Sequence, residues 1–372
     1  MAARLRHLGP ALAFALIAIV APPAGAHADR AAVDAASSGV DSELRKTVPI
    51  TRRPQARPRV VLAIGPGRLS GLRRRDRLEL LSEVQVTVDC DKRSPRCAGR
   101  PYDFDPRLVV SLEIARRAST DARSRVVARR SLTCRQQLPN RQHHCPVVFD
   151  KTTRVGDNFP CRLHRCFANV VVSASSPQAR GGERMIIGSN KPNGRIVQNK
   201  SRLSAIRLAP GTTAQRLQST DLRRNSLRLR PRRKVVLSQK VEEPERGDVL
   251  AVSAALRSDV RRLGYNALVG GELIVARGPR ATQPSHLVRR SVWQQGRISP
   301  TNGTNCTPIQ SPCGTRKVGV VKVRRDVRGS SGGPASLFIN LVIRTKQKRV
   351  AREHGARLRL RGGKIEVRSY SP

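Results

Sequence analysis

The sequence predicts an all-β protein made of two tandem β-sandwich domains of jelly-roll type that derive from an internal duplication. Apolar residues alternate with polar residues in many short segments, whereas no long segment repeats its apolar residues at the 3.6-residue period of a helix. Several segments also recur in the same order in the two halves of the chain, as expected of a duplicated unit. The length of 372 residues suits two domains of ordinary size.

Alternation of period two marks the predicted strands. In residues 78–88, Leu and Val alternate with Glu, Gln and Thr, apart from one phase break at residues 81–82 that indicates a bulge or a bend. Residues 108–114 and residues 250–256 follow the same pattern. We therefore expect short strands with Val, Leu and Ile on a dry face and with polar side chains, mainly Arg, on a wet face.

Near the end of the chain, residues 357–368 predict a β-hairpin. Arg and Leu alternate up to Gly362 and Gly363, and Ile and Val alternate with charged residues after them. A pair of glycines favours a tight turn because glycine readily adopts positive φ angles. The expected structure is two short antiparallel strands joined at these glycines.

Four pairs of segments predict the duplication. Their offsets are about 175, 160, 151 and 155 residues, and their common order carries more weight than any single match. The alternative is that Val- and Arg-rich β segments align by chance. The pairs are residues 60–62 with 235–237 (followed by 75–80 with 247–252), 108–116 with 268–277, 180–188 with 331–340, and 202–203 with 357–358.

Composition sets the expected boundaries. The stretch before the first predicted strand is rich in small residues, Ser, Pro and Arg, and the stretch between the halves is basic and lacks a sustained apolar period. Both compositions predict flexible linkers. The predicted organisation is a signal peptide at 1–28, a flexible linker at 29–57, a first β-sandwich domain at 58–210, a basic linker at 211–232 and a second β-sandwich domain at 233–372.

The beginning of the chain is typical of a secretory signal. Arg4 and Arg6 precede a short apolar core at residues 10–22, and Ala26-His27-Ala28 forms a small-x-small cleavage site. The apolar run of about 13 residues is shorter than the ~20 that a membrane-spanning helix needs. We therefore expect a mature protein without a stable membrane span, either secreted or associated with the cell envelope.

The eight cysteines agree with export, because exported thiols tend to oxidise. They fall into neighbouring pairs with separations of 7, 11, 5 and 7 residues. Four local disulfides are the simplest connectivity, although spacing alone leaves other pairings open. The predicted disulfide cysteines are Cys90, Cys97, Cys134, Cys145, Cys161, Cys166, Cys306 and Cys313.

The charge predicts an anionic partner. The chain has 72 Lys+Arg, of which 60 are Arg, against 26 Asp+Glu, for a formal net charge of +46. Arg binds phosphate and carboxylate bidentately, so an anionic polymer or a cell-envelope component is the expected partner, while a composition bias without an evolved partner is the alternative. Few aromatics (3%) disfavour nucleic acid. The predicted polyanion-binding residues are Arg73, Arg74, Arg75, Arg228, Arg230, Arg232, Arg233, Lys234, Arg357, Arg359 and Arg361.

One segment suggests protease chemistry. Residues 329–334 (GSSGGP) resemble the segment around the nucleophile of trypsin-like serine proteases, and the resemblance implies Ser331 as the nucleophile. The preceding residue is Ser330, where that family keeps an Asp, and the chain lacks the Ala-Ala-His-Cys segment of the family. A nucleophile also needs a positioned base, and none can be named, so the sequence predicts a Gly-Gly turn at this segment.

Two further clusters suggest chemistry. His143, His144 and His164 lie near cysteines in an arrangement that a zinc ion could use, with two disulfides beside exposed histidines as the alternative. Asp103 and Asp105 would share one face of a strand, as a glycosidase pair would need, although acids in so basic a chain usually pair with Arg. Neither cluster fixes a reaction, and we predict no bound metal and no cofactor.

The sequence therefore predicts an exported, strongly basic, non-enzymatic β-sandwich protein that binds anionic polymers or partners at the cell envelope through Arg-rich strands. Two alternatives stay open. One is an extracellular hydrolase with a site in a loop, and the other is a structural or adhesive surface module whose copies pack edge to edge.

Overall fold

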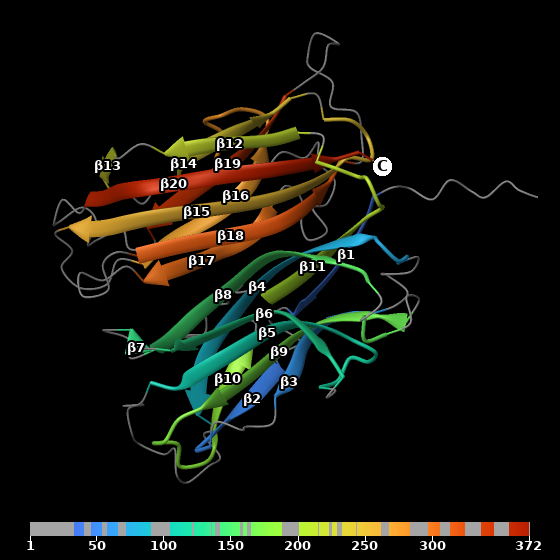
Figure 1. Ribbon diagram of the computed structural model, residues 1–372. Helices are drawn as coiled ribbons and strands as arrows, with labels where there is room; N and C mark the ends of the chain where they lie inside the picture. Colours follow the sequence, from blue (N-terminus) through green and yellow to red (C-terminus); the bar gives the residue numbers. More distant parts are fainter. Residues whose placement is uncertain are drawn as a thin grey trace, which may run out of the picture. The chain divides into compact units, whose positions relative to one another are not determined.

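The described residues form twenty β-strands and no α-helix, so the predicted all-β class is confirmed (Figure 1). The structure is a computed structural model of residues 1–372. The residues that it describes are 33–40, 46–53, 58–65, 72–90, 105–120, 123–134, 136–137, 142–156, 159–161, 165–187, 201–214, 216–222, 225–228, 233–242, 244–261, 268–282, 297–305, 313–323, 336–345 and 357–371. The predicted signal peptide at residues 1–28 lies outside them.

Eleven strands form the first sheet. The sheet doubles back at β2, which pairs antiparallel with β10 and parallel with β9. One layer has the order β1-β11-β4-β8, and the other has the order β3-β9-β5-β6. The strands are β1 (Val33–Val40), β2 (Lys46–Thr51), β3 (Arg59–Ile64), β4 (Arg77–Cys90), β5 (Arg107–Ala115), β6 (Arg125–Thr133), β7 (Gln136–Gln137), β8 (Gln142–Arg154), β9 (Phe167–Ser175), β10 (Glu183–Ile187) and β11 (Ser201–Leu208).

The remaining strands form a five-stranded and a four-stranded sheet. One layer has the order β12-β20-β15-β18, with β13 on the first half of β20, and the other has the order β14-β19-β16-β17. The strands are β12 (Arg216–Leu222), β13 (Asn225–Arg228), β14 (Lys234–Val241), β15 (Val249–Arg261), β16 (Leu268–Ala276), β17 (Arg297–Asn305), β18 (Cys313–Lys322), β19 (Leu337–Thr345) and β20 (Arg357–Tyr370).

Alternation places an apolar core between each pair of layers. In the first, Leu78 and Leu80 of β4 are buried in one cluster with Leu108 of β5 and Val170 of β9. In the second, Leu250 and Val252 of β15 are buried with strands β16, β19 and β20. Burial of side chains of this size stabilises the fold by about 1.5–3 kcal/mol each, before the cost of chain entropy.

The two sets of layers share one pattern of strand pairing. The order β3-β9-β5-β6 has the same sequence of connections as β14-β19-β16-β17, and β1-β11-β4-β8 has the same as β12-β20-β15-β18. The ladders also shift register at equivalent places, between Val60 and Leu62 in β3 and between Val235 and Leu237 in β14. These are the residues of the first predicted segment match.

The turn that precedes β4 recurs before β15. Asp76 accepts a hydrogen bond through Oδ2 from the backbone N–H of Arg73 at 2.8 Å, and Asp248 accepts one from Glu245 at 3.0 Å. Arg75 has a φ of 75° and Gly247, at the equivalent place, has a φ of 103°. Because this turn needs the left-handed region, Gly adopts it freely whereas Arg75 does so at a cost of about 1–2 kcal/mol.

The strand pairing changes two of the four segment matches. β10 and β11 both pair with β4, whereas a single long strand, β20, pairs along β15. Residues 183–187 take the place on β4 that the beginning of β20 takes on β15, whereas residues 331–340 include part of β19. Leu208 lies opposite Arg77 and Tyr370 lies opposite Val249, so the ladder positions of residues 202–203 on β4 match those of residues 364–365 on β15 and differ from those of residues 357–358.

The expected linkers contain strands. β1 and β2 lie within residues 29–57, and β12 and β13 lie within residues 211–232. Each of these strands takes its hydrogen bonds from a neighbouring strand: β1 pairs with β11, β2 with β10 and β9, and both β12 and β13 with β20. Pairing with a neighbour decides the conformation of such segments more than local propensity does. The weakly patterned sequences of these segments therefore did not predict strands.

The predicted bulge at residues 81–82 is wrong. β4 pairs with β8 in unbroken register from Arg77 to Thr87, so all odd-numbered residues of β4 share one face. Leu81 lies on this face with polar neighbours, and an apolar side chain is stable there because other strands cover the face. Leu81 belongs to a third apolar cluster, which contains Val148 and Ile206 from the first set of strands and Val318 and Val320 from β18. The β4 layer therefore packs against the layer that contains β18.

The predicted hairpin at residues 357–368 is also wrong. β20 continues as one strand through Gly362 and Gly363, and neither glycine has a positive φ. A Cβ atom at Gly363 would lie 2.9 Å from Leu237 Cδ1 and 3.0 Å from the carbonyl oxygen of Ala255. This glycine serves close packing inside a strand, which is the other common role of glycine in sheets.

We expect Gly363→Ala to lower the free energy of unfolding by about 1–3 kcal/mol, because the added methyl group would overpack the site. Gly362→Ala is the matched control, since a Cβ there meets nothing within 4 Å. Chemical denaturation of both variants measures the difference. Equal stability of the two variants would contradict the packing role of Gly363.

Candidate functional site

The fold sorts charges by sign. Among the residues whose exposure the structure describes, 27 of 35 basic side chains are exposed, whereas 4 of 13 acidic side chains are. Because burial of a charge requires a partner, the acidic groups take hydrogen bonds and ion pairs inside the fold. The described surface is therefore more basic than the composition alone indicates. The buried acidic residues are Asp76, Glu79, Glu83, Glu113, Glu183, Asp248 and Glu272.

The predicted arginines do not form one surface. Arg73, Arg74 and Arg75 are exposed in the turn before β4. At this end of β4, Glu79 contacts Tyr370, which ends β20. Arg357 begins β20, and the 13 residue-to-residue steps from Arg357 to Tyr370 correspond to about 43 Å at 3.3 Å per step. The two predicted groups of basic residues are therefore far apart.

The second group is brought together in part. β13 pairs with the beginning of β20, so that Arg228 lies opposite Arg357 in the ladder. Arg359 lies two residues further along β20, and Arg361 is exposed on the same strand. Lys234 is exposed at the beginning of β14. Arg230 and Arg232 lie outside the described residues.

Arg233 has a different role from the predicted one. Its guanidinium group is ion-paired with Glu272 of β16, whose side chain is 2% exposed. A charge that neutralises a buried carboxylate is not available to a polymer, so the prediction for this residue does not agree with its position.

Four arginines that no run in the sequence indicated lie at one end of the β5, β6 and β9 strands. Arg116 and Arg117 follow β5, Arg125 begins β6, and Arg165 precedes β9; all four are exposed. The ladders place these strand ends side by side, with Ile114 opposite Arg125 and Ala115 opposite Phe167. We call Arg116, Arg117, Arg125 and Arg165 the arginine cluster.

Neutral groups hold the arginine cluster in place. Arg116 donates from Nε to the carbonyl oxygen of Pro160 at 2.5 Å, and the guanidinium carbon of Arg125 lies 5.9 Å from the centre of the Phe159 ring. The fully buried Asn169 donates to the carbonyl oxygen of Arg117 at 2.8 Å. These contacts leave the guanidinium charges without an acidic partner in the described part of the chain.

The carboxylate of β5, that of Glu113, accepts its hydrogen bonds from serine hydroxyl groups. Glu113 is buried and accepts hydrogen bonds from Ser111 at 2.5 Å and from Ser124 at 2.8 Å. Two hydroxyl groups therefore satisfy this carboxylate in place of an arginine.

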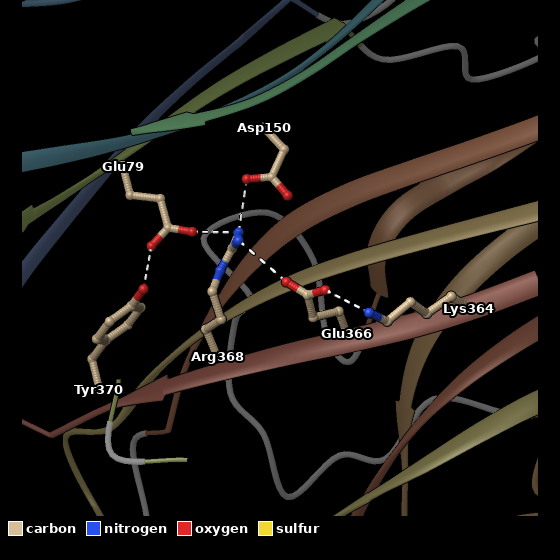
Figure 2. A network of polar contacts seen from close by, with 6 residues as sticks. All are labelled: Glu79, Asp150, Lys364, Glu366, Arg368 and Tyr370. Carbon is tan, nitrogen blue, oxygen red and sulfur yellow. Dashed lines mark hydrogen bonds and ion pairs between the residues drawn. The ribbon is translucent and has the colours of Figure 1, made fainter. Parts of the chain in front are cut away.

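A buried ionic network joins β4 and β8 to β20 (Figure 2). Arg368 is ion-paired with Glu79 of β4, and its Nη2 lies 2.7 Å from Asp150 of β8. Tyr370 donates from its hydroxyl group to Glu79 at 2.6 Å. Glu366 lies 3.4 Å from Arg368 at the outer side of the network. Every carboxylate of the network thus faces a cation, which suits a structural contact.

Burial dominates the protonation of this network. It raises the pKa of Glu79, although the charge of Arg368 and the hydrogen bond from Tyr370 act in the opposite direction. It also raises the pKa of Tyr370, which the charge of Glu79 raises further. For Arg368, burial lowers the pKa, but the charges of Glu79 and Asp150 outweigh this effect and leave the pKa above its ordinary value. Arg368 and Tyr370 therefore keep their protons at neutral pH.

A second buried ion pair lies on the same face of β4. The Nζ atom of Lys317, in β18, lies 2.7 Å from Oε1 of Glu83, and both side chains are 4% exposed. Gln85 also donates to this carboxylate oxygen at 2.5 Å. Sequence patterns could not reveal the pair, because the two residues are 234 positions apart.

Two of the four predicted disulfides are confirmed. Cys134 and Cys145 have a Cα–Cα distance of 5.6 Å, and Cys161 and Cys166 have one of 5.3 Å. The pairs Cys90 with Cys97 and Cys306 with Cys313 extend outside the described residues. In the disulfides, Cys145, Cys161 and Cys166 lose the thiolates that a metal ion would need.

The remaining candidates are described incompletely. His143 and His144 belong to β8, but their side chains, and all of His164, lie outside the description; no three potential metal ligands converge within it. Ser331, Ser330 and Asp103 also lie outside the described residues, while Asp105 is exposed before β5. No described helix has the length and apolar character to cross a membrane.

The fold and the site thus define an all-β protein whose exposed charge is basic. No protein-family model and no curated protein matches the chain. Among solved structures, it is similar to the N-terminal CBM22-1-CBM22-2 tandem domain of Xyn10C from Paenibacillus barcinonensis, with a TM-score of 0.20 and 10% identity over 90% of this chain and 94% of that chain. It is also similar to the structure of infectious bursal disease virus, Gx strain, with a TM-score of 0.16 and 9% identity over 91% and 80%. At such TM-scores, neither similarity supports a function.

Proposed function

We propose that this chain is an exported, non-enzymatic protein that binds anionic polymers at the cell envelope through its exposed arginines. The observation that carries the proposal is the sorting of charge, with 27 exposed basic side chains against 4 exposed acidic ones in the described part of the chain. Two disulfides support an oxidising location outside the cytoplasm.

The buried acids strengthen this electrostatic argument. Glu79, Glu83 and Glu272 are each neutralised by a basic residue inside the fold, and each pair removes one charge of either sign from the surface. The exposed guanidinium groups that remain repel one another, and a polyanion relieves that repulsion while it releases its counterions. Arg suits this role because its planar fork matches phosphate, sulfate and carboxylate groups.

The proposal includes a duplicated architecture with boundaries that differ from those expected from composition. The recurrence of strand order, of the β3 and β14 register shifts and of the Asp76 and Asp248 turns supports two copies of one unit. Because β12 pairs with β20 as β1 pairs with β11, and β13 pairs with β20 as β2 pairs with β10, the first copy would span about residues 33–208 and the second about 216–370.

We expect binding of the full chain to heparin and to inorganic polyphosphate to weaken steeply with salt. The logarithm of the affinity should fall linearly with the logarithm of the salt concentration, and tight binding should be lost by about 0.5 M salt, because the released counterions drive association. Fluorescence anisotropy of the labelled polymers measures this dependence. A neutral dextran is the matched control polymer and should not bind. An affinity that stays constant up to about 0.5 M salt would exclude the electrostatic mechanism.

A further inference from the structure

The arginine cluster combines two braced guanidinium groups, those of Arg116 and Arg125, at neighbouring strand ends. An arginine side chain that no neighbouring group holds loses side-chain entropy when it makes an ordered contact. Arg116 is fixed by the carbonyl group of Pro160, and Arg125 is stacked on Phe159, the residue directly before Pro160. Two consecutive residues of one short loop therefore orient two guanidinium groups toward the same region.

The backbone around the cluster is also fixed. Asn169 is fully buried and holds the carbonyl group of Arg117, so the segment after β5 cannot swing away from β9. The Cys161–Cys166 disulfide closes the loop that carries Arg165, and the same loop begins directly after Pro160. A preorganised group of donors loses less entropy when a ligand binds than a flexible one does.

We propose that the arginine cluster is the specific binding site for tetrahedral oxyanions, phosphate or sulfate, carried on a linear polymer. This inference rests on the proposed function and assigns it to a defined place. The guanidinium groups come from three neighbouring strand ends, so they approach a ligand from different directions. A tetrahedral oxyanion offers oxygens in several directions, whereas a planar carboxylate offers two in one plane. Arg116 and Arg125 bind one such group, and Arg117 and Arg165 bind its neighbour along the polymer.

The test compares two double variants of the full chain that lose the same charge. Arg116→Gln/Arg125→Gln removes the two braced arginines, and Arg277→Gln/Arg280→Gln removes two exposed arginines that follow β16. At about 0.15 M salt the Debye length is about 8 Å, so arginines outside the site act only weakly on an oxyanion that is bound there. We expect the first variant to bind polyphosphate at least about tenfold more weakly, with a salt slope lower by about two, and the control to change less than about twofold.

A third variant, Arg116→Lys/Arg125→Lys, keeps the charge and removes the bidentate forks. We expect it to retain the salt slope of the unmodified chain but to bind severalfold more weakly, because an ammonium group acts as a point charge. Thermal unfolding monitored by circular dichroism checks that all variants are folded. If the lysine variant folds and binds as tightly as the unmodified chain, the guanidinium geometry has no role and the proposal fails.

The probes separate the two sources of oxyanion. Polyphosphate and heparin are compared with polyglutamate, which carries carboxylates. If polyphosphate or heparin binds more tightly than polyglutamate, the result supports the proposal and identifies the preferred group as phosphate or sulfate. Equal affinity for polyglutamate overturns it. Equal losses in the two double variants would overturn the site while leaving polyanion binding intact. No binding of any polymer by the unmodified chain would overturn the proposed function itself.

Discussion

Arg368→Met is expected to lower the free energy of unfolding by about 3–5 kcal/mol at pH 7. The substitution leaves the buried carboxylate of Glu79 and that of Asp150 next to each other without their shared cation. Removal of one partner from a buried ion pair is costly because the other charge cannot regain its hydration. Chemical denaturation, monitored by circular dichroism, measures the loss.

The loss should depend on pH in a defined direction. Burial already raises the pKa of Glu79, and without Arg368 the charge that opposed this increase is absent. A carboxyl group with a raised folded-state pKa favours the folded state at pH values below its unfolded value of about 4.5, and this advantage disappears as the pH rises through the folded-state pKa. The deficit of Arg368→Met relative to the unmodified chain should therefore shrink as the pH falls from 7 toward 4.5.

Two further variants make this prediction specific. Arg368→Met/Glu79→Gln should recover at least half of the loss at pH 7 and should depend less on pH, since the orphaned carboxylate is gone. Arg361→Met is the matched control on the same strand, and because Arg361 is exposed its effect should stay within about 0.5 kcal/mol. A pH-independent deficit in Arg368→Met would show that Glu79 does not carry it.

Lys317→Met is expected to cost a similar amount, about 3–5 kcal/mol, for the same physical reason. Lys317 and Glu83 are both 4% exposed, so the variant leaves a carboxylate in a nearly dry contact between β18 and β4. Gln85 still donates to that carboxylate, which reduces the penalty but cannot supply a charge. Urea denaturation at pH 7 measures the effect.

The corresponding double variant measures the coupling between the two side chains. Lys317→Met/Glu83→Gln should regain most of the stability, because a neutral amide keeps an acceptor for Gln85 and needs no cation. Arg316→Met, at the exposed neighbouring position, should change stability by no more than about 0.5 kcal/mol. Additive effects of the two single substitutions would mean that the pair does not form in solution.

The two ion pairs lie at a contact that sequence periodicity could not locate. Alternation in β4 predicts one apolar and one polar face, and the polar residues were expected on a solvated face. In the structure this second face is covered by the layer that contains β18 and β20, and Leu81, Glu79 and Glu83 are all buried there. The apparent phase break at Leu81 was the one local sign that the face was not solvated.

In the candidate site, too, local sequence patterns and the packing of distant strands determine different things. Runs of arginine in the sequence indicated Arg73, Arg233 and Arg357 as binding residues. Arg233, however, neutralises a buried acid, and the other two lie near opposite ends of β20. The arginine cluster is built from three strand ends that are up to about 50 positions apart in the chain. No local run could reveal it, because the β5, β6 and β9 pairings create the proximity.

From its amino-acid order alone, this chain is determined to be all-β, strongly basic and cross-linked between neighbouring cysteines. These properties depend on side-chain period, on composition and on short spacings, all of which act over a few residues. Tertiary structure decided which polar face is buried, which arginines are neutralised, and why Gly363 continues a strand where a turn was expected. Alternation determines which side chains share a face, but only the packing of distant strands determines what covers that face.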